Sequence, residues 1–160
     1  MEIYREKLYG KRIEMGEVLK THFLSRLKSF KEALKILESL KNLDREEFLI
    51  DVMKIYAAER AIQVIAEFCI DLSNYILLKT GRDIPKTYRD SIKSIGELNL
   101  CRSDVIKFME NLIGLRNIIV HMYADVKTEV IYNNLNEIVR YSKQYIDSLF
   151  EYMLEKKIDP

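Results

Sequence analysis

Three polar residues, Arg116, Asn117 and His121, lie in an otherwise apolar stretch of the sequence that runs from Leu112 to Ala124. Histidine titrates near neutral pH, so it can accept or donate a proton during a reaction. Arginine stays charged and presents a planar fork of N–H donors to phosphate oxygens, where it stabilises charge that develops in a transition state. The pair therefore suits phosphodiester chemistry. The alternative is an Arg–His pair that is buried in an interface and only stabilises it.

This stretch is expected to form a helix that is apolar on two sides. At about 100° per residue, Arg116, Asn117 and His121 fall on one side and most of the aliphatic side chains on the other. A helix of this kind must be covered on both sides. A second copy of the chain is predicted to cover the Arg/His side, and a two-fold dimer would bring two such pairs together. The side predicted to face the core of the chain consists of Leu112, Leu115, Ile118, Ile119 and Met122.

Composition restricts the fold that can position these residues. The chain has 160 residues, of which 48% are apolar, with only 5 Gly and 2 Pro. This is enough apolar material for a core and too few turn-forming residues for a many-stranded fold, so an all-α class is predicted. The balance of 26 basic and 25 acidic residues excludes a chain that binds nucleic acid by gross charge alone. We expect a single domain over residues 1–160, with an N-terminal extension at 1–15.

Apolar periodicity predicts an antiparallel bundle of about five helices. Asp44 and Glu47 have the spacing of a capping box, in which each side chain binds a backbone N–H near the other. Gly81 is expected to end a helix in the left-handed conformation. The expected helices lie at about 17–42, 45–79, 87–96, 103–123 and 128–155.

Residue spacing excludes several kinds of metal and nucleotide site. Cys69 and Cys101 are 32 residues apart and are expected to be core residues, and His22 is expected at the surface or in an interface. A two-metal nuclease requires clustered carboxylates. The helix that carries His121 has no carboxylate after Glu110. The sequence also lacks a Glu-x-x-His pair for a di-iron bundle and a glycine-rich loop for phosphate. No metal and no cofactor are predicted.

The segment from Arg116 to Tyr123, RNIIVHMY, resembles the Arg-x4-His-x-Tyr motif of HEPN-domain ribonucleases, and more narrowly that of the HepT-like toxins. The resemblance extends from about Phe48 to the last helix. It includes YAAERAIQVIAEFCID at 56–71 and GRDIPKTY at 81–88. It implies a HEPN-like helical homodimer that cuts RNA without a metal, at a cleft formed between the two protomers.

The resemblance also implies a role for each residue of the motif. His121 would be the acid/base that acts on the ribose 2′-OH or on the leaving oxygen, and Arg116 would clamp the scissile phosphate. Asn117 would orient His121 or bind phosphate. Tyr123 would be the site to which a minimal nucleotidyltransferase (MNT-type) antitoxin attaches AMP. This adds negative charge beside the cleft, which should repel RNA.

Two further groups of charged residues each have two interpretations. Arg60, Glu67 and Asp71 share one face of the predicted helix over 45–79, at spacings of seven and four residues. They are either a solvated stripe or a supporting set that holds Arg116. The basic residues around the Pro85 loop are either solvated or a rim that contacts RNA; they are Lys79, Arg82, Lys86 and Arg89.

The resemblance thus implies a metal-independent endoribonuclease toxin that leaves a 2′,3′-cyclic phosphate and is neutralised by AMPylation of Tyr123. The alternative is a HEPN nucleotide-binding or scaffold module that partners a nucleotidyltransferase without turnover. No signal-peptide core and no uncharged run of about 18 residues occur. A cytoplasmic protein with no membrane partner is therefore expected.

Overall fold

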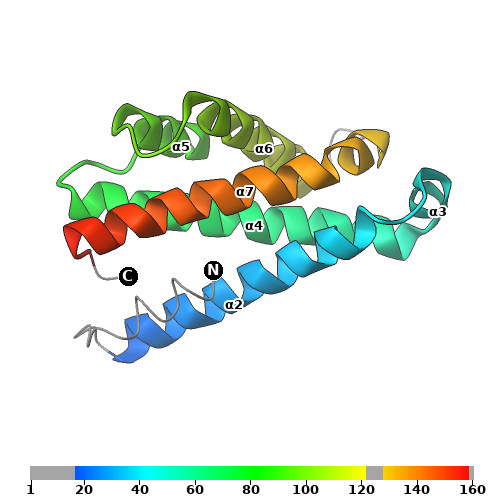
Figure 1. The fold of residues 1–160 in the computed structure, drawn as a ribbon, viewed down its shortest axis with the longest axis horizontal. Helices are drawn as coiled ribbons and strands as arrows, with labels where there is room; N and C mark the ends of the chain where they lie inside the picture. Colours follow the sequence, from blue (N-terminus) through cyan, green and yellow to red (C-terminus); the bar gives the residue numbers. More distant parts are fainter. Residues whose placement is uncertain (1–16, 122–127, 159–160) are drawn as a thin grey trace.

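The structure is built from α-helices. The computed structural model describes residues 17–121 and 128–158, and all regular secondary structure within these two segments is helical (Figure 1). This confirms the all-α class predicted from composition. The described helices are α2 (Glu17–Leu40), α3 (Arg45–Ile50), α4 (Val52–Lys79), α5 (Tyr88–Glu97), α6 (Ser103–His121) and α7 (Thr128–Lys156).

The central helix of the bundle is α4, which packs against α2, α3, α5, α6 and α7. Figure 1 shows α2 on one side of α4 and the α5–α6 pair on the other, with α7 running alongside α4. By length and composition, α4 is the one described helix that could cross a membrane, but most of its apolar segment is buried inside the bundle. Its apolar character is that of a core helix.

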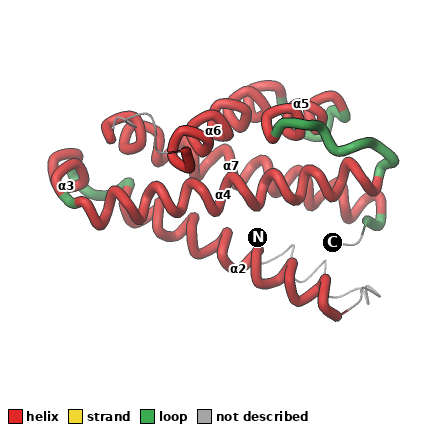
Figure 2. Tube along the Cα trace, turned by 180° about the vertical axis from the view of Figure 1, so that it is seen from behind, coloured by secondary structure: helices red, strands yellow, loops and turns green. Residues whose placement is uncertain are grey.

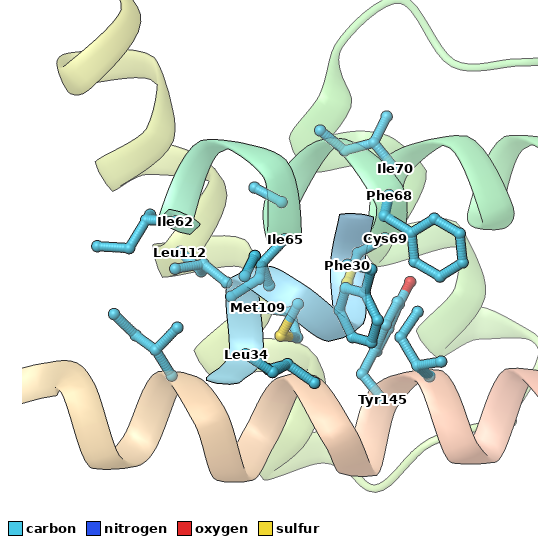
Figure 3. Packing of buried hydrophobic residues seen from close by; sticks show 14 of the residues in the cluster. Phe30, Leu34, Ile62, Ile65, Phe68, Cys69, Ile70, Met109, Leu112 and Tyr145 are labelled. Carbon is cyan, nitrogen blue, oxygen red and sulfur yellow. The ribbon is translucent and has the colours of Figure 1, made fainter. Parts of the chain in front are cut away.

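The core lies where α2, α4, α6 and α7 meet (Figure 3). Phe30 and Phe68 stack there with their ring centroids 4.9 Å apart. One polar contact lies within this apolar core: the Tyr145 hydroxyl is 2.6 Å from Ser73 Oγ, which in turn donates to the Cys69 carbonyl at 2.6 Å. Both hydroxyl groups therefore have partners, as buried polar groups require.

The predicted helix over residues 45–79 is in fact two helices, which meet at Asp51. This residue has an extended backbone, and its carboxylate accepts hydrogen bonds from two N–H groups in the first turn of α4, at 3.0 and 3.3 Å. The predicted capping box is also wrong, because the Asp44 side chain makes no cap bond and the Glu47 carboxylate accepts from Lys54 Nζ at 2.9 Å. Apolar residues recur through both helices, so their periodicity does not reveal the break.

The other predicted helices agree with the structure to within a few residues. Gly81 has φ +76° after the end of α4, and the Arg82 N–H donates to the Leu77 carbonyl at 2.9 Å. This is the left-handed helix end that the sequence predicts. His22 is exposed, as expected. The predicted N-terminal extension, 1–15, lies outside the described residues.

Thr87 fixes the start of α5. Its hydroxyl accepts a hydrogen bond from the Asp90 backbone N–H at 3.1 Å and lies 2.7 Å from the Asp90 carboxylate, to which it donates. The loop from α4, drawn in green in Figure 2, ends at this cap. Because α5 packs on α6, the cap determines where Tyr88 and Arg89, in the first turn of α5, lie beside α6.

Candidate functional site

Arg116 lies on the buried face of α6. It follows Met109 by two helical turns, and Met109, Leu112 and Ile113 are all buried in the core. The Arg116 side chain is only 12% exposed, whereas Ile118, which was predicted to face the core, is 43% exposed. The predicted assignment of the two sides of this helix is therefore only partly right. Leu112 is buried and Leu115 and Ile119 pack against the core, as predicted, whereas Ile118 is exposed. Met122 lies outside the described residues. Both sides are apolar in sequence, and the contacts with α4 and α5 decide which of them is buried.

Three neighbours hold the Arg116 guanidinium. Its Nη2 donates to Glu67 Oε1 of α4 at 3.0 Å, and its Nη1 donates to the Asn117 side-chain oxygen at 3.2 Å. Its central carbon lies 5.3 Å from the centre of the Tyr88 ring of α5, which is cation–π distance. Glu67 Oε1 also accepts from Gln63 Nε2 at 3.0 Å. Residues from three helices therefore fix the position of one cation.

The electrostatics of this cluster keep Glu67 ionised. Partial burial raises the pKa of the Glu67 carboxyl, but hydrogen bonds from Arg116 and Gln63, with the charges of Arg116 and Arg60, leave that pKa below its ordinary value. Among the described residues, the buried Nε–H of Arg116 has no hydrogen-bond partner. The cluster thus holds a charged, oriented arginine whose position is fixed by its two terminal nitrogens.

His121 is the last residue of α6 and is exposed. Five residues separate it from Arg116, which corresponds to about 140° around the helix, so within one chain the two side chains point in different directions. No hydrogen bond or ion pair joins them within the described residues. Asn117, one turn before His121, shares its face and also contacts Arg116. Tyr123 lies outside the described residues.

The predicted supporting residues do not act as one group. Glu67 contacts Arg116 directly, whereas Asp71 forms its ion pair with Arg26 of α2. Arg60 is exposed and acts on Glu67 only through its charge. Neither Asp71 nor Arg60 contacts Arg116 in the described part of the chain. Helical spacing places these residues on one face but does not show which of them meets α6.

Tyr88 and Gln63 also belong to this cluster, although the sequence alone assigns neither of them an individual role. The Thr87–Asp90 cap that places Tyr88 has a recognisable spacing, so this signal was present in the sequence. Gln63 lies one turn before Glu67 on α4, a spacing at which a glutamine supports an acidic neighbour.

The basic residues around the Pro85 loop have different neighbours. Arg82 pairs with Glu97 at 3.6 Å, and Lys79 Nζ lies 5.4 Å from the centre of an aromatic ring of its own helix. Arg89 instead reaches α6, where its Nη2 lies 2.7 Å from the position that a Cβ on Gly114 would occupy. Only a glycine leaves room for this approach.

The two cysteines are core residues, as predicted. Cys69 is fully buried and Cys101 is partly buried, and neither forms a disulfide. Burial raises the pKa of the Cys101 thiol to about 11, so this thiol is protonated at neutral pH. Among the described residues, no group of three or more His, Cys, Asp or Glu side chains is arranged to hold a metal ion.

Two curated relatives are ribonucleases by name. The chain is 29% identical over 86 residues to the mRNA nuclease HepT of Shewanella oneidensis, a match that covers 54% of this chain and 65% of that protein. It thus spans slightly less than two thirds of the length of that relative. It is 22% identical over 130 residues to the tRNA nuclease HepT of Aphanizomenon flos-aquae, with 81% of this chain and 88% of the relative covered.

Solved structures share the fold. A tri-AMPylated HEPN toxin of Shewanella oneidensis, in complex with an MNT antitoxin, superposes with a TM-score of 0.72 at 23% identity and covers 84% of this chain and 98% of its own. A toxin–antitoxin complex with AMP-PNP gives a TM-score of 0.71 at 23% identity, with 79% of this chain and 96% of the other covered.

The family match includes the helices that build the site. The family described as Ribonuclease HepT-like matches residues 30–149, which span most of the chain and contain Glu67, Tyr88 and the complete segment from Arg116 to Tyr123. This chain is therefore a member of the HepT-like ribonuclease family.

Proposed function

We propose that the chain is a metal-independent endoribonuclease toxin. The observation that supports this most directly is the ordered position of Arg116: Glu67, Asn117 and Tyr88 hold its guanidinium beside the exposed end of α6, where His121 lies. Arginine and histidine are the groups that bind a phosphodiester and transfer its protons. The two curated relatives, named as mRNA and tRNA nucleases, support RNA as the substrate.

In this mechanism, one His121 imidazole takes the proton of the ribose 2′-OH, and the 2′-oxygen then attacks the adjacent phosphorus. The bond from phosphorus to the 5′-oxygen breaks, and the leaving oxygen is protonated by a second imidazolium. The products are a 2′,3′-cyclic phosphate and a 5′-hydroxyl. Arg116 stabilises the negative charge that builds on the phosphate oxygens in the transition state.

The reaction requires a second copy of the chain. Arg116 and His121 point in different directions within one protomer, and a general base and a general acid are both needed. The apolar side chains of Ile118 and Val120, which precede His121 by three residues and by one, are 43% and 36% exposed. Such side chains suit burial against a partner. A homodimer formed at this end of α6 would cover them and bring two His121 side chains to one cleft.

The proposed regulation acts on the same cleft. An MNT-type nucleotidyltransferase antitoxin would transfer AMP from ATP to the hydroxyl of Tyr123, two residues after His121, with release of pyrophosphate. The added phosphate and bulk would repel the RNA backbone. The Shewanella oneidensis toxin of the same fold is described as tri-AMPylated and in complex with an MNT antitoxin. The proposed compartment is the cytoplasm.

The test is cleavage of a single-stranded RNA in EDTA by the His121→Ala variant. We expect cleavage to fall by about a hundredfold to ten-thousandfold, because loss of a general acid–base group removes roughly 10²–10⁴ in rate. Mass spectrometry of the wild-type products should show the cyclic phosphate. Circular dichroism and the particle mass in solution, both expected to be unchanged, control for folding and assembly. Undiminished cleavage by this variant would contradict the role of His121.

A second candidate function is a nucleotide-binding or scaffold module without turnover. The burial of Arg116 and its pairing with Glu67 favour it, because a guanidinium engaged in this way contributes less to a phosphate than a free one. This candidate predicts that the purified wild-type chain binds RNA or nucleotide but produces no cyclic phosphate.

A further inference from the structure

We infer that Arg89, in the first turn of α5, is an RNA-positioning residue that binds a phosphate next to the one being cleaved. The inference rests on the proposed ribonuclease function and extends it, because it adds a cation from another helix to the motif on α6. It is carried by the close contact between Arg89 and Gly114, by the place of Gly114 on α6, and by the free charge of Arg89.

The first argument is the place of the contact on α6. Arg89 Nη2 lies over Gly114, at 2.7 Å from the position of an added Cβ. His121 follows Gly114 by seven residues, so the two are within about 20° of each other around the helix. Asn117 lies between them, three residues after Gly114. Arg89 therefore stands on the face of α6 that carries His121.

The second argument is the contrast with Arg116. The Arg116 guanidinium is 12% exposed and paired with Glu67, on a face about 140° away from His121. Arg89 is exposed, and no hydrogen bond or ion pair joins it to another residue in the described part of the chain. On the His121 face of α6 in one protomer, Arg89 is thus a cation free to bind an anion.

The third argument is that the position of Arg89 is built into the fold. The Thr87–Asp90 cap fixes the backbone at the start of α5, and the Asp90 carboxylate accepts from Thr87 and forms no ion pair with Arg89 within the described residues. On α6, the absence of a side chain at Gly114 gives the guanidinium room to lie against the helix. Two local features on two helices thus place one charge.

The geometry indicates which phosphate Arg89 contacts. Seven residues of helix correspond to about 10 Å along the axis, so a phosphate above Gly114 is not the one whose ester bond lies at His121. Arg89 therefore binds a neighbouring phosphate and sets the direction of the strand across α6. A contact of this kind contributes to affinity without reading the base sequence.

The experiment measures binding of a fluorescein-labelled single-stranded RNA to the full chain carrying His121→Ala, so that the RNA stays intact. Adding Arg89→Ala should raise the Kd about tenfold, as expected for loss of a charge-assisted hydrogen bond at an exposed site. It should also reduce the slope of log Kd against log salt concentration by about one, because one fewer counterion is displaced. Arg89→Lys should retain most of the slope.

Gly114→Ala provides a second variant, which moves Arg89 without removing it. The added Cβ meets only the end of a flexible side chain, and alanine is the better helix former, so the melting temperature should stay the same or rise. We expect the same increase in Kd as for Arg89→Ala, and the double variant should lose no more than Arg89→Ala alone. Arg140→Ala is the matched control, since Arg140 is an exposed guanidinium on α7 that pairs with Glu137.

The inference is overturned if Arg89→Ala and Gly114→Ala both bind RNA with the Kd and salt slope of Arg140→Ala. If His121→Ala still abolishes cleavage in that case, the proposed function stands and only the role of Arg89 is lost. A wild-type chain that neither binds nor cuts RNA would overturn both.

Discussion

Two polar clusters lie on α4 only six residues apart in sequence, and they differ in nearly every physical respect. At Ser73, two neutral hydroxyl groups meet in the core, Tyr145 is fully buried, and both groups have partners. At Glu67, two charged groups meet at the edge of the core, both side chains keep some exposure, and the Arg116 Nε–H has no acceptor among the described residues. The first cluster has all its hydrogen bonds made, while the second leaves one buried donor without an acceptor among the described residues.

This difference separates a structural contact from a candidate functional one. Burying a neutral hydroxyl pair costs little when both groups are bonded, so the Ser73 cluster serves packing alone. Burying an ion pair is rarely a net gain in stability. The Glu67–Arg116 pair is therefore better explained by what it positions than by the stability it adds. Substitutions in the two clusters should have correspondingly different effects.

The largest effect on stability is expected from Glu67→Ala. It leaves the mostly buried charge of Arg116 without its acidic partner, which should lower the free energy of unfolding by about 3 kcal/mol. RNA cleavage should also fall, because Arg116 loses its orientation. Urea unfolding and a cleavage assay on the same preparation measure both. The matched control is Glu97→Ala, which breaks an exposed ion pair and should change stability little.

The pH dependence sharpens the same comparison. Because the pKa of Glu67 in the folded chain lies below its ordinary value of 4.5, its stabilising contribution is present above pH 4.5 and is lost as the pH falls through the lower, folded-state value. The Glu67→Gln variant should therefore lose less stability on acidification than the wild type does. Equal acid sensitivity of the two proteins would argue against an ionised Glu67.

An intermediate effect is expected at the neutral cluster. Ser73→Ala leaves the buried Tyr145 hydroxyl without a partner and should cost about 2 kcal/mol, whereas Tyr145→Phe removes that hydroxyl and should cost about 1 kcal/mol. Burial raises the pKa of Tyr145, although its hydrogen bond with Ser73 opposes this, so the hydroxyl stays neutral at neutral pH. Urea unfolding at pH 7 separates the two variants. A loss of RNA cleavage by folded Ser73→Ala would contradict a purely structural role.

The smallest effect is expected at the ring that contacts Arg116. Tyr88→Ala removes a cation–π contact at a half-exposed site and should lower the free energy of unfolding by about 0.5–1 kcal/mol. Tyr88→Phe keeps the ring face and should match the wild type in both stability and cleavage. If the phenylalanine variant behaved like the alanine variant, the hydroxyl rather than the ring would be the important group.

The sequence by itself was sufficient for the local features of this protein. The all-α class, the positions of α2, α5 and α7 and the left-handed end at Gly81 depend on composition, on periodicity and on single residues. The family was likewise recognisable from the segment between Arg116 and Tyr123. Each of these depends on neighbours a few residues away, which the sequence displays directly.

The tertiary structure decided what each polar residue contacts. Glu67 and Arg116 are 49 residues apart, and Arg89 and Gly114 are 25 residues apart. Helical spacing gives the face on which a residue lies, but it does not say which face another helix covers. In α6, apolar residues occur on both sides, so packing against α4 and α5 determined that Arg116 is buried while the face carrying His121 remains open.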